Sequence, residues 1–218
     1  MGVLLGVLRG RFRAGQHRRG AVHAQKALTA AFTAAVLCTA SALYPGLATA
    51  QSPASSEAAV DTRPEVNAAL PQAQLVGKTR LSVFGFQIYD ARLWAAPGFG
   101  GSSYSSQPLA LELTYLRDFK ALDIAERSIK EMRRSSAISD MQETKWLADM
   151  QRVVPDVKKG DRILGIHKPG IGAGFWVNGK PVGDIADPEF AKLFFGIWLS
   201  PKTSEPQMRS RLLNGAAG

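Results

Sequence analysis

The sequence predicts an α+β fold in which a layer of helices packs on one face of an antiparallel sheet. Several strand-like segments follow each other through short turns, which favours antiparallel pairing. The segments come in the order strand pair, strand, two helices, three strands and two helices. This order lacks the regular strand–helix–strand alternation of parallel sheets, and it is typical of an α+β domain.

The first strand pair occupies residues 79–84 and 86–94, which are rich in β-branched and aromatic side chains and are separated by Gly85. A flexible loop is expected at residues 97–103. Residues 109–115 alternate strictly, with Leu109, Leu111, Leu113 and Tyr115 on one face. This period of two predicts a half-buried strand.

Two helices are expected next. Residues 120–134 carry apolar side chains three and four positions apart, which predicts an amphipathic helix whose basic and acidic residues are solvated. The second helix is expected to start at Ser139, because Gln142 three residues later completes a capping box. Its apolar stripe ends at Val154, before Pro155.

The C-terminal half is expected to form three strands and two helices. Residues 162–167, 175–177 and 180–185 are the strands, and Asn178-Gly179 predicts a type I′ hairpin turn between the last two. Asp187-Pro188 predicts a helix start, followed by an apolar, buried core helix at residues 189–198. Ser204 is expected to cap a last short helix.

Residues 1–50 have the layout of a secretory signal peptide. Six basic residues and no acidic ones precede and border an Ala-rich apolar run, and the small-residue sequence Leu47-Ala48-Thr49-Ala50 resembles a cleavage site. We therefore expect export to the periplasm or the medium; an uncleaved N-terminal anchor is the alternative. Residues 51–73, rich in Ala, Ser and Pro, are expected to be a flexible lead-in to a domain at residues 74–218.

Composition excludes several functions. The net charge is +9, and removal of the six leader cations leaves +3, so the basic excess belongs to the leader and not to a nucleic-acid-binding face. Cys38 leaves with the leader, which excludes a cysteine nucleophile. Only His167 remains among three histidines, which argues against a metal site, and it is expected to be an edge or surface strand residue. We expect no metal and no cofactor.

Arg80 and Tyr89 are the candidate functional residues, because they are polar groups inside otherwise apolar strand sequence. A guanidinium with a phenol suits a carboxylate or an enolate-like oxygen. On an unbroken strand they would face opposite ways, whereas a bulge or tight turn at Gly85 would let both face one pocket. The alternative is that Arg80 is a surface cation and Tyr89 a core aromatic.

The residues resemble the chalcone isomerase-like family, in its exported bacterial branch. The resemblance rests on G-x-x-R ending at Arg80, FQIYDARL at residues 86–93, VKKGDR at 157–162, FWVNG at 175–179, DPEFA at 187–191 and FGIWLS at 195–200. It covers about residues 74–213. It implies an open-faced β-sandwich with a ligand cleft between sheet and helices, lined by an arginine matching Arg80.

The same resemblance bears on activity. Fatty-acid-binding relatives carry a tyrosine at the position of Tyr89, whereas true isomerases carry a threonine there. The sequence therefore predicts a binding protein for a small apolar anion such as a fatty acid, with Arg80, Tyr89 and, as an additional wall, Tyr115 at the ligand. One alternative is an intramolecular lyase that closes a chalcone-type ring, with Arg80 as the catalytic residue. Another is a non-catalytic interaction module of the cell envelope. The oligomeric state is left open.

Overall fold

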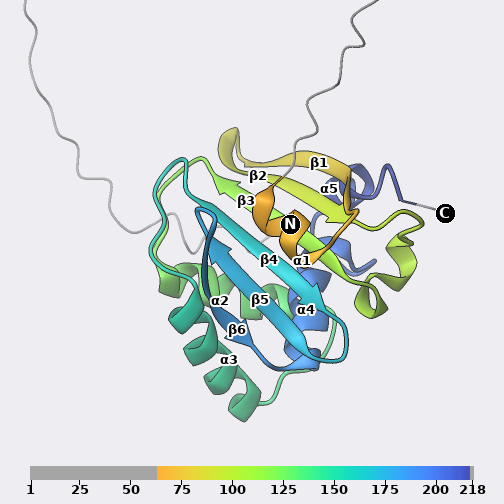
Figure 1. The fold of residues 1–218 in the computed structure, drawn as a ribbon. Helices are drawn as coiled ribbons and strands as arrows, with labels where there is room; N and C mark the ends of the chain where they lie inside the picture. The colour runs from red at the N-terminus through yellow and green to blue at the C-terminus, as the bar shows by residue number, and fades with distance from the viewer. Residues whose placement is uncertain (1–62, 217–218) are drawn as a thin grey trace, which may run out of the picture. The chain divides into compact units, whose positions relative to one another are not determined.

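The computed structural model of the chain describes residues 63–216, which form a six-stranded antiparallel sheet (Figure 1). Each strand pairs with the next along the chain. The strands are β1 (Gln74–Val83), β2 (Phe86–Ala95), β3 (Leu109–Tyr115), β4 (Arg162–Lys168), β5 (Gly172–Val177) and β6 (Lys180–Ile185). The predicted signal peptide at residues 1–50 and the start of the lead-in lie outside the described residues.

A layer of helices covers one face of this sheet, as predicted. It consists of α2 (Ala121–Met132), α3 (Asp140–Val153), α4 (Pro188–Leu199) and α5 (Pro206–Leu212), and a 3-10 segment, η1 (Gly101–Ser106), lies in the loop between β2 and β3. The predicted α+β class is therefore confirmed. Within the described residues, none of the helices is long and apolar enough to cross a membrane.

The main core lies between the sheet and α4. Leu109, Leu111, Leu113 and Tyr115 on β3 are all buried there, as the period of two predicts. The prediction that this strand is only half-buried is wrong, because Ala110 and Glu112 on its other face are also 0% exposed. Helix α4 contributes an aromatic cluster to the same core: Phe190, Phe194, Phe195 and Trp198. Its two-sided apolar character follows from this position, because α4 packs on the sheet and on neighbouring helices.

The local signals for helix and hairpin ends are confirmed with one exception. Ser139 and Gln142 form the capping box of α3, and Asp187 accepts hydrogen bonds from the backbone of Glu189 and Phe190. Asn178 and Gly179 have φ values of 50° and 81°, as a type I′ turn requires. The exception is the last helix, for which the prediction of a Ser204 cap is wrong: Glu205 precedes α5, which starts at Pro206.

A short helix, α1 (Pro64–Ala69), covers part of the opposite face of the sheet. Its Val66 is buried against Trp94, Ala110, Leu164 and Ile166, which form a second, smaller core. The structure thus departs from the expected flexible lead-in for residues 63–73, because one turn of amphipathic helix buries an apolar side chain there. The second core also explains why β4 is apolar on both faces.

His167 lies on the interior strand β4 and is buried, so the prediction of an edge or surface position is wrong. Its Nδ1 lies 3.0 Å from the carbonyl oxygen of Gln107, and its ring packs on Phe195 with centroids 5.2 Å apart. Burial lowers the pKa of His167 below its ordinary value, against the opposing effect of the Gln107 hydrogen bond. His167 is a neutral core residue.

Candidate functional site

The register of the β1–β2 hairpin decides where the predicted site residues point. Phe84 and Gly85, both with positive φ, form the turn, and Val83 pairs with Phe86 and Ser82 with Gln87. Continued unchanged, this register would place Arg80 opposite Tyr89. Instead the pairing shifts by one residue at Ile88, so that Leu81 pairs with Tyr89 and Arg80 with Asp90.

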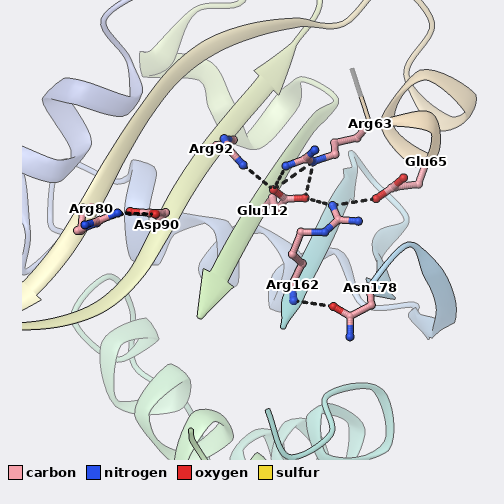
Figure 2. A network of polar contacts seen from close by, with 8 residues as sticks. All are labelled: Arg63, Glu65, Arg80, Asp90, Arg92, Glu112, Arg162 and Asn178. Atoms are coloured by element: carbon pink, nitrogen blue, oxygen red, sulfur yellow. Dashed lines mark hydrogen bonds and ion pairs between the residues drawn. The ribbon is translucent and has the colours of Figure 1, made fainter. Parts of the chain in front are cut away.

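Arg80 consequently lies on the face of the sheet away from α2–α5. Directly paired residues share a face and consecutive residues alternate, so Arg80 and Asp90 face one way and Tyr89 the other. Arg80 forms a two-point ion pair with Asp90, with Nε–Oδ1 at 2.5 Å and Nη2–Oδ2 at 2.8 Å (Figure 2). The hydrogen bonds from Arg80 lower the pKa of the Asp90 carboxyl. Arg80 and Tyr89 therefore do not face one pocket. The structure agrees with the alternative, in which Arg80 is a surface cation and Tyr89 packs against the core.

Tyr89 faces the helices, where it meets Tyr115. The Tyr89 hydroxyl oxygen accepts a hydrogen bond of 3.0 Å from Nε1 of Trp198 on α4. The Tyr89 and Tyr115 rings make an edge contact with centroids 6.1 Å apart, and Tyr115 contacts Phe119 at 5.7 Å. Burial raises the pKa of both phenols, so both keep their protons. The structure thus brings together two of the three predicted site residues.

Three charged side chains supply the electrostatic environment of Tyr89. Arg127 and Glu131 lie on α2, with Arg127 Nη2 2.7 Å from Glu131 Oε1, and Glu205 precedes α5. After burial and the Trp198 hydrogen bond, Glu205 and Glu131 raise the pKa of Tyr89 while Arg127 lowers it. Burial, and then Glu131, raise the pKa of Glu205 itself. Thr79 on β1 lies on the same face of the sheet as Tyr89. We refer to these residues together as the helix-face site: Thr79, Tyr89, Tyr115, Arg127, Glu131, Trp198 and Glu205.

Apolar side chains next to the helix-face site are only partly covered. Leu81, Phe119 and Ile124 pack against the main core but remain partly exposed, as does Tyr89. Phe86 is 47% exposed, and the Arg117 guanidinium lies 4.8 Å from the centre of its ring. The helix-facing side of the hairpin therefore combines incompletely buried apolar surface with the polar groups around Tyr89.

The opposite face carries a different polar cluster, centred on Glu112 (Figure 2). Glu112 on β3 is 0% exposed and is contacted by three arginines, each from a different element. Arg63 donates from Nε at 3.0 Å and Nη2 at 3.1 Å, Arg92 lies at 3.4 Å, and Arg162 makes a short hydrogen bond. Arg162 also contacts Glu65 on α1 at 3.2 Å. We refer to these five residues as the Glu112 network.

The Glu112 network holds the N-terminal segment on the sheet. Arg63 and Glu65 come from the cap and first turn of α1, whereas the other three residues come from β2, β3 and β4. Its central carboxylate is buried and already hydrogen-bonded to arginines on both oxygens. Such a saturated carboxylate is suited to stabilising the fold, and the helix-face site is the better candidate for a ligand.

The sequence interpretation missed most of the helix-face site. Arg127 and Glu131 were expected on the solvated side of their helix, but Glu131 is buried. Trp198 was expected as a core residue only. The four-residue spacing of Arg127 and Glu131 does predict their ion pair. No local pattern places that pair near a tyrosine more than thirty residues away.

Comparison with known proteins agrees with this architecture. Residues 58–214 match the family model described as chalcone isomerase-like. The chain belongs to the chalcone isomerase-like family. It is 26% identical over 140 residues to an uncharacterized protein of Haemophilus influenzae, covering 64% of this chain and 67% of that protein.

A solved structure also has a similar fold. The crystal structure of a fatty-acid-binding protein of Arabidopsis thaliana matches with a TM-score of 0.52 and 10% sequence identity, covering 66% of this chain and 88% of that chain. At this identity the likeness concerns the chalcone isomerase-like fold alone. It confirms the open sheet with helices expected from the sequence.

Proposed function

We propose that this chalcone isomerase-like protein is an exported binding protein for an apolar small molecule with one polar end, of which a fatty acid is the type example. The ligand's polar end lies at Tyr89, and its apolar part lies along the half-covered side chains between the β1–β2 hairpin and the helices. The observation that carries this proposal is the Tyr89–Trp198 hydrogen bond, a polar contact beside incompletely buried apolar surface.

Two further features support a ligand site on the helix-facing side of the sheet. Arg127, which is ion-paired with Glu131, lies on this side and contributes to the electrostatic environment of Tyr89. Tyr115 forms the wall beside Tyr89. The fatty-acid-binding protein of similar fold makes lipid-like ligands the first class to test. Ring closure by Arg80 has no comparable support, because its guanidinium is paired with Asp90 on the other face.

The test is ligand extraction from the purified protein, followed by titration with decanoic acid. We expect a co-purifying acyl compound, and we expect Tyr89→Phe to weaken decanoic acid binding about tenfold through loss of one hydrogen bond, about 1.4 kcal/mol. The matched control is Arg80→Ala, which should leave binding within about twofold because Arg80 faces away. Loss of binding in Arg80→Ala with none in Tyr89→Phe would refute the assignment of the site.

Export is tested separately. A fusion of residues 1–50 to a reporter enzyme that folds only outside the cytoplasm should be active. A fusion from which the same residues are deleted should be inactive. Equal activity of the two fusions would contradict the signal-peptide part of the proposal.

A further inference from the structure

Two buried side-chain atoms in the described part of the chain have no hydrogen-bond partner, and both belong to residues on the helix-facing side of the sheet. They are Thr79 Oγ1 and Glu131 Oε2. Thr79 pairs with Ala91, two residues along β1 from the Leu81–Tyr89 pair and therefore on the same face. Glu131 contributes to the electrostatic environment of Tyr89 from α2. A buried polar atom without a partner is costly, and it calls for a group that the protein itself does not supply.

The hydrogen-bonding character of these side chains defines which kind of ligand group could pair with them. The Tyr89 oxygen already accepts from Trp198, so its proton is what it offers to a ligand, and the Thr79 hydroxyl is a second donor. Glu131 Oε2, in contrast, is an acceptor. It forms an ion pair with Arg134 Nε, but at 3.7 Å this contact is too long for a hydrogen bond. A single ligand group that hydrogen-bonded to all three would therefore have to both accept and donate. An ionised carboxylate only accepts.

The charges around the site also favour an uncharged ligand group. The groups that face Tyr89 include two carboxylates, Glu131 and Glu205, against Arg127 on α2, and the neutral phenol of Tyr115 on β3. Arg134 adds a second cation next to Glu131. With two acids against two bases, the site has no surplus positive charge to compensate the burial of an anion.

We propose that the helix-face site binds its ligand by an uncharged polar end that both donates and accepts: a carboxylic acid in its protonated form, or the hydroxyls of a glycerol monoester. The ligand's carbonyl or hydroxyl oxygen accepts from Tyr89 and Thr79, and its O–H donates to Glu131. This inference rests on the proposed function and specifies the chemistry of that same site.

The experiment compares three probes with the same ten-carbon chain by calorimetric titration of the full-length protein. At pH 7.5 we expect monodecanoylglycerol to bind at least about tenfold more tightly than decanesulfonate, which is always charged. Affinity for decanoic acid should fall about tenfold per pH unit above its pKa, because only the protonated fraction is competent to bind. Monodecanoylglycerol, which does not titrate, controls for any effect of pH on the protein itself.

Two variants separate this inference from the proposed function. Thr79→Val, which keeps the shape of the side chain, should weaken monodecanoylglycerol binding severalfold. Glu131→Gln should strengthen decanesulfonate binding and so reduce the difference in affinity between decanesulfonate and monodecanoylglycerol. Glu126→Gln, on the exposed side of the same helix, should change neither the affinity for decanesulfonate nor this difference. Tighter binding of decanesulfonate than of the monoester by the unaltered protein would refute the proposal that the ligand's polar end is uncharged. It would leave the proposed binding of apolar ligands intact. Failure of all three probes to bind would overturn both.

Discussion

Replacement of Glu112 by glutamine tests how the N-terminal helix is held on the sheet. The substitution keeps the shape of the side chain and removes its charge, leaving Arg63, Arg92 and Arg162 directed at a neutral amide. Because Glu112 is 0% exposed, water cannot take the place of the lost carboxylate. We expect marked destabilisation, with release of α1 as its first structural consequence.

The magnitude follows from the contacts. Arg63 donates to Glu112 from two groups, Nε and Nη2, and Arg162 donates from one. Each of these donor groups is worth roughly 1.5–3 kcal/mol, while the 3.4 Å contact of Arg92 adds little. The arginine side chains are 23%, 30% and 25% exposed, so they recover part of their hydration after the substitution. We therefore expect a loss of about 3 kcal/mol in the free energy of unfolding, at the lower end for a broken buried ion pair.

The assay is urea unfolding followed by tryptophan fluorescence. With a slope of about 2 kcal/mol per molar urea, the midpoint should fall by about 1.5 M. Asp90→Asn is the matched control, because it removes the carboxylate of an exposed arginine pair on the same face and should cost at most about 1 kcal/mol. If Glu112→Gln cost no more than Asp90→Asn, the argument that burial makes the Glu112 network strong would be refuted.

Other consequences of the structure are equally open to measurement. Tyr89→Phe leaves the buried indole N–H of Trp198 without its acceptor and should lower the free energy of unfolding by about 1–3 kcal/mol in the same urea assay; an unchanged midpoint would show that another acceptor replaces the phenol. Thr79→Val removes a buried hydroxyl that lacks a partner, so the ligand-free protein should become more stable by about 1 kcal/mol, and a loss of stability would contradict the absence of a partner. The pKa of His167 is lowered in the folded state, so on acidification the unfolded chain binds a proton first, and the free energy of unfolding should fall as the pH drops below about 6.5. The slope of this fall is at most about 1.4 kcal/mol per pH unit, and His167→Phe should reduce it. An unchanged slope in the variant would show that other groups cause the pH dependence.

The sequence was sufficient where structure depends on neighbouring residues. The capping box at Ser139 and Gln142, the Asp187 cap and the Asn178-Gly179 turn were all predicted correctly. Each of these signals acts through hydrogen bonds or backbone conformations within four residues, so the information is contained in the segment itself. The alternation in β3 likewise identified the face that packs on the helices.

The candidate site depended on a single step in register. The turn at Phe84-Gly85 starts a pairing that would have placed Arg80 opposite Tyr89, and the shift at Ile88 places Arg80 opposite Asp90 instead. A one-residue slip transfers every later side chain to the other face of the sheet. The Arg80–Asp90 ion pair and the burial of Tyr89 against Trp198 both favour the shifted register, and neither is visible from one strand alone.

What the sequence by itself determined was the family, the class of fold and the ends of most elements, because these follow from local hydrogen bonding and from the periodicity of apolar residues. Only the tertiary structure decided which polar groups meet. Glu112, on the polar side of its strand, proved to be buried because Arg63 and Arg162 reach it from other elements, and Glu131 was brought to Tyr89 by the packing of α2. A charged side chain can be buried only where partners distant in sequence compensate it, and their positions are set by the packing of the whole domain.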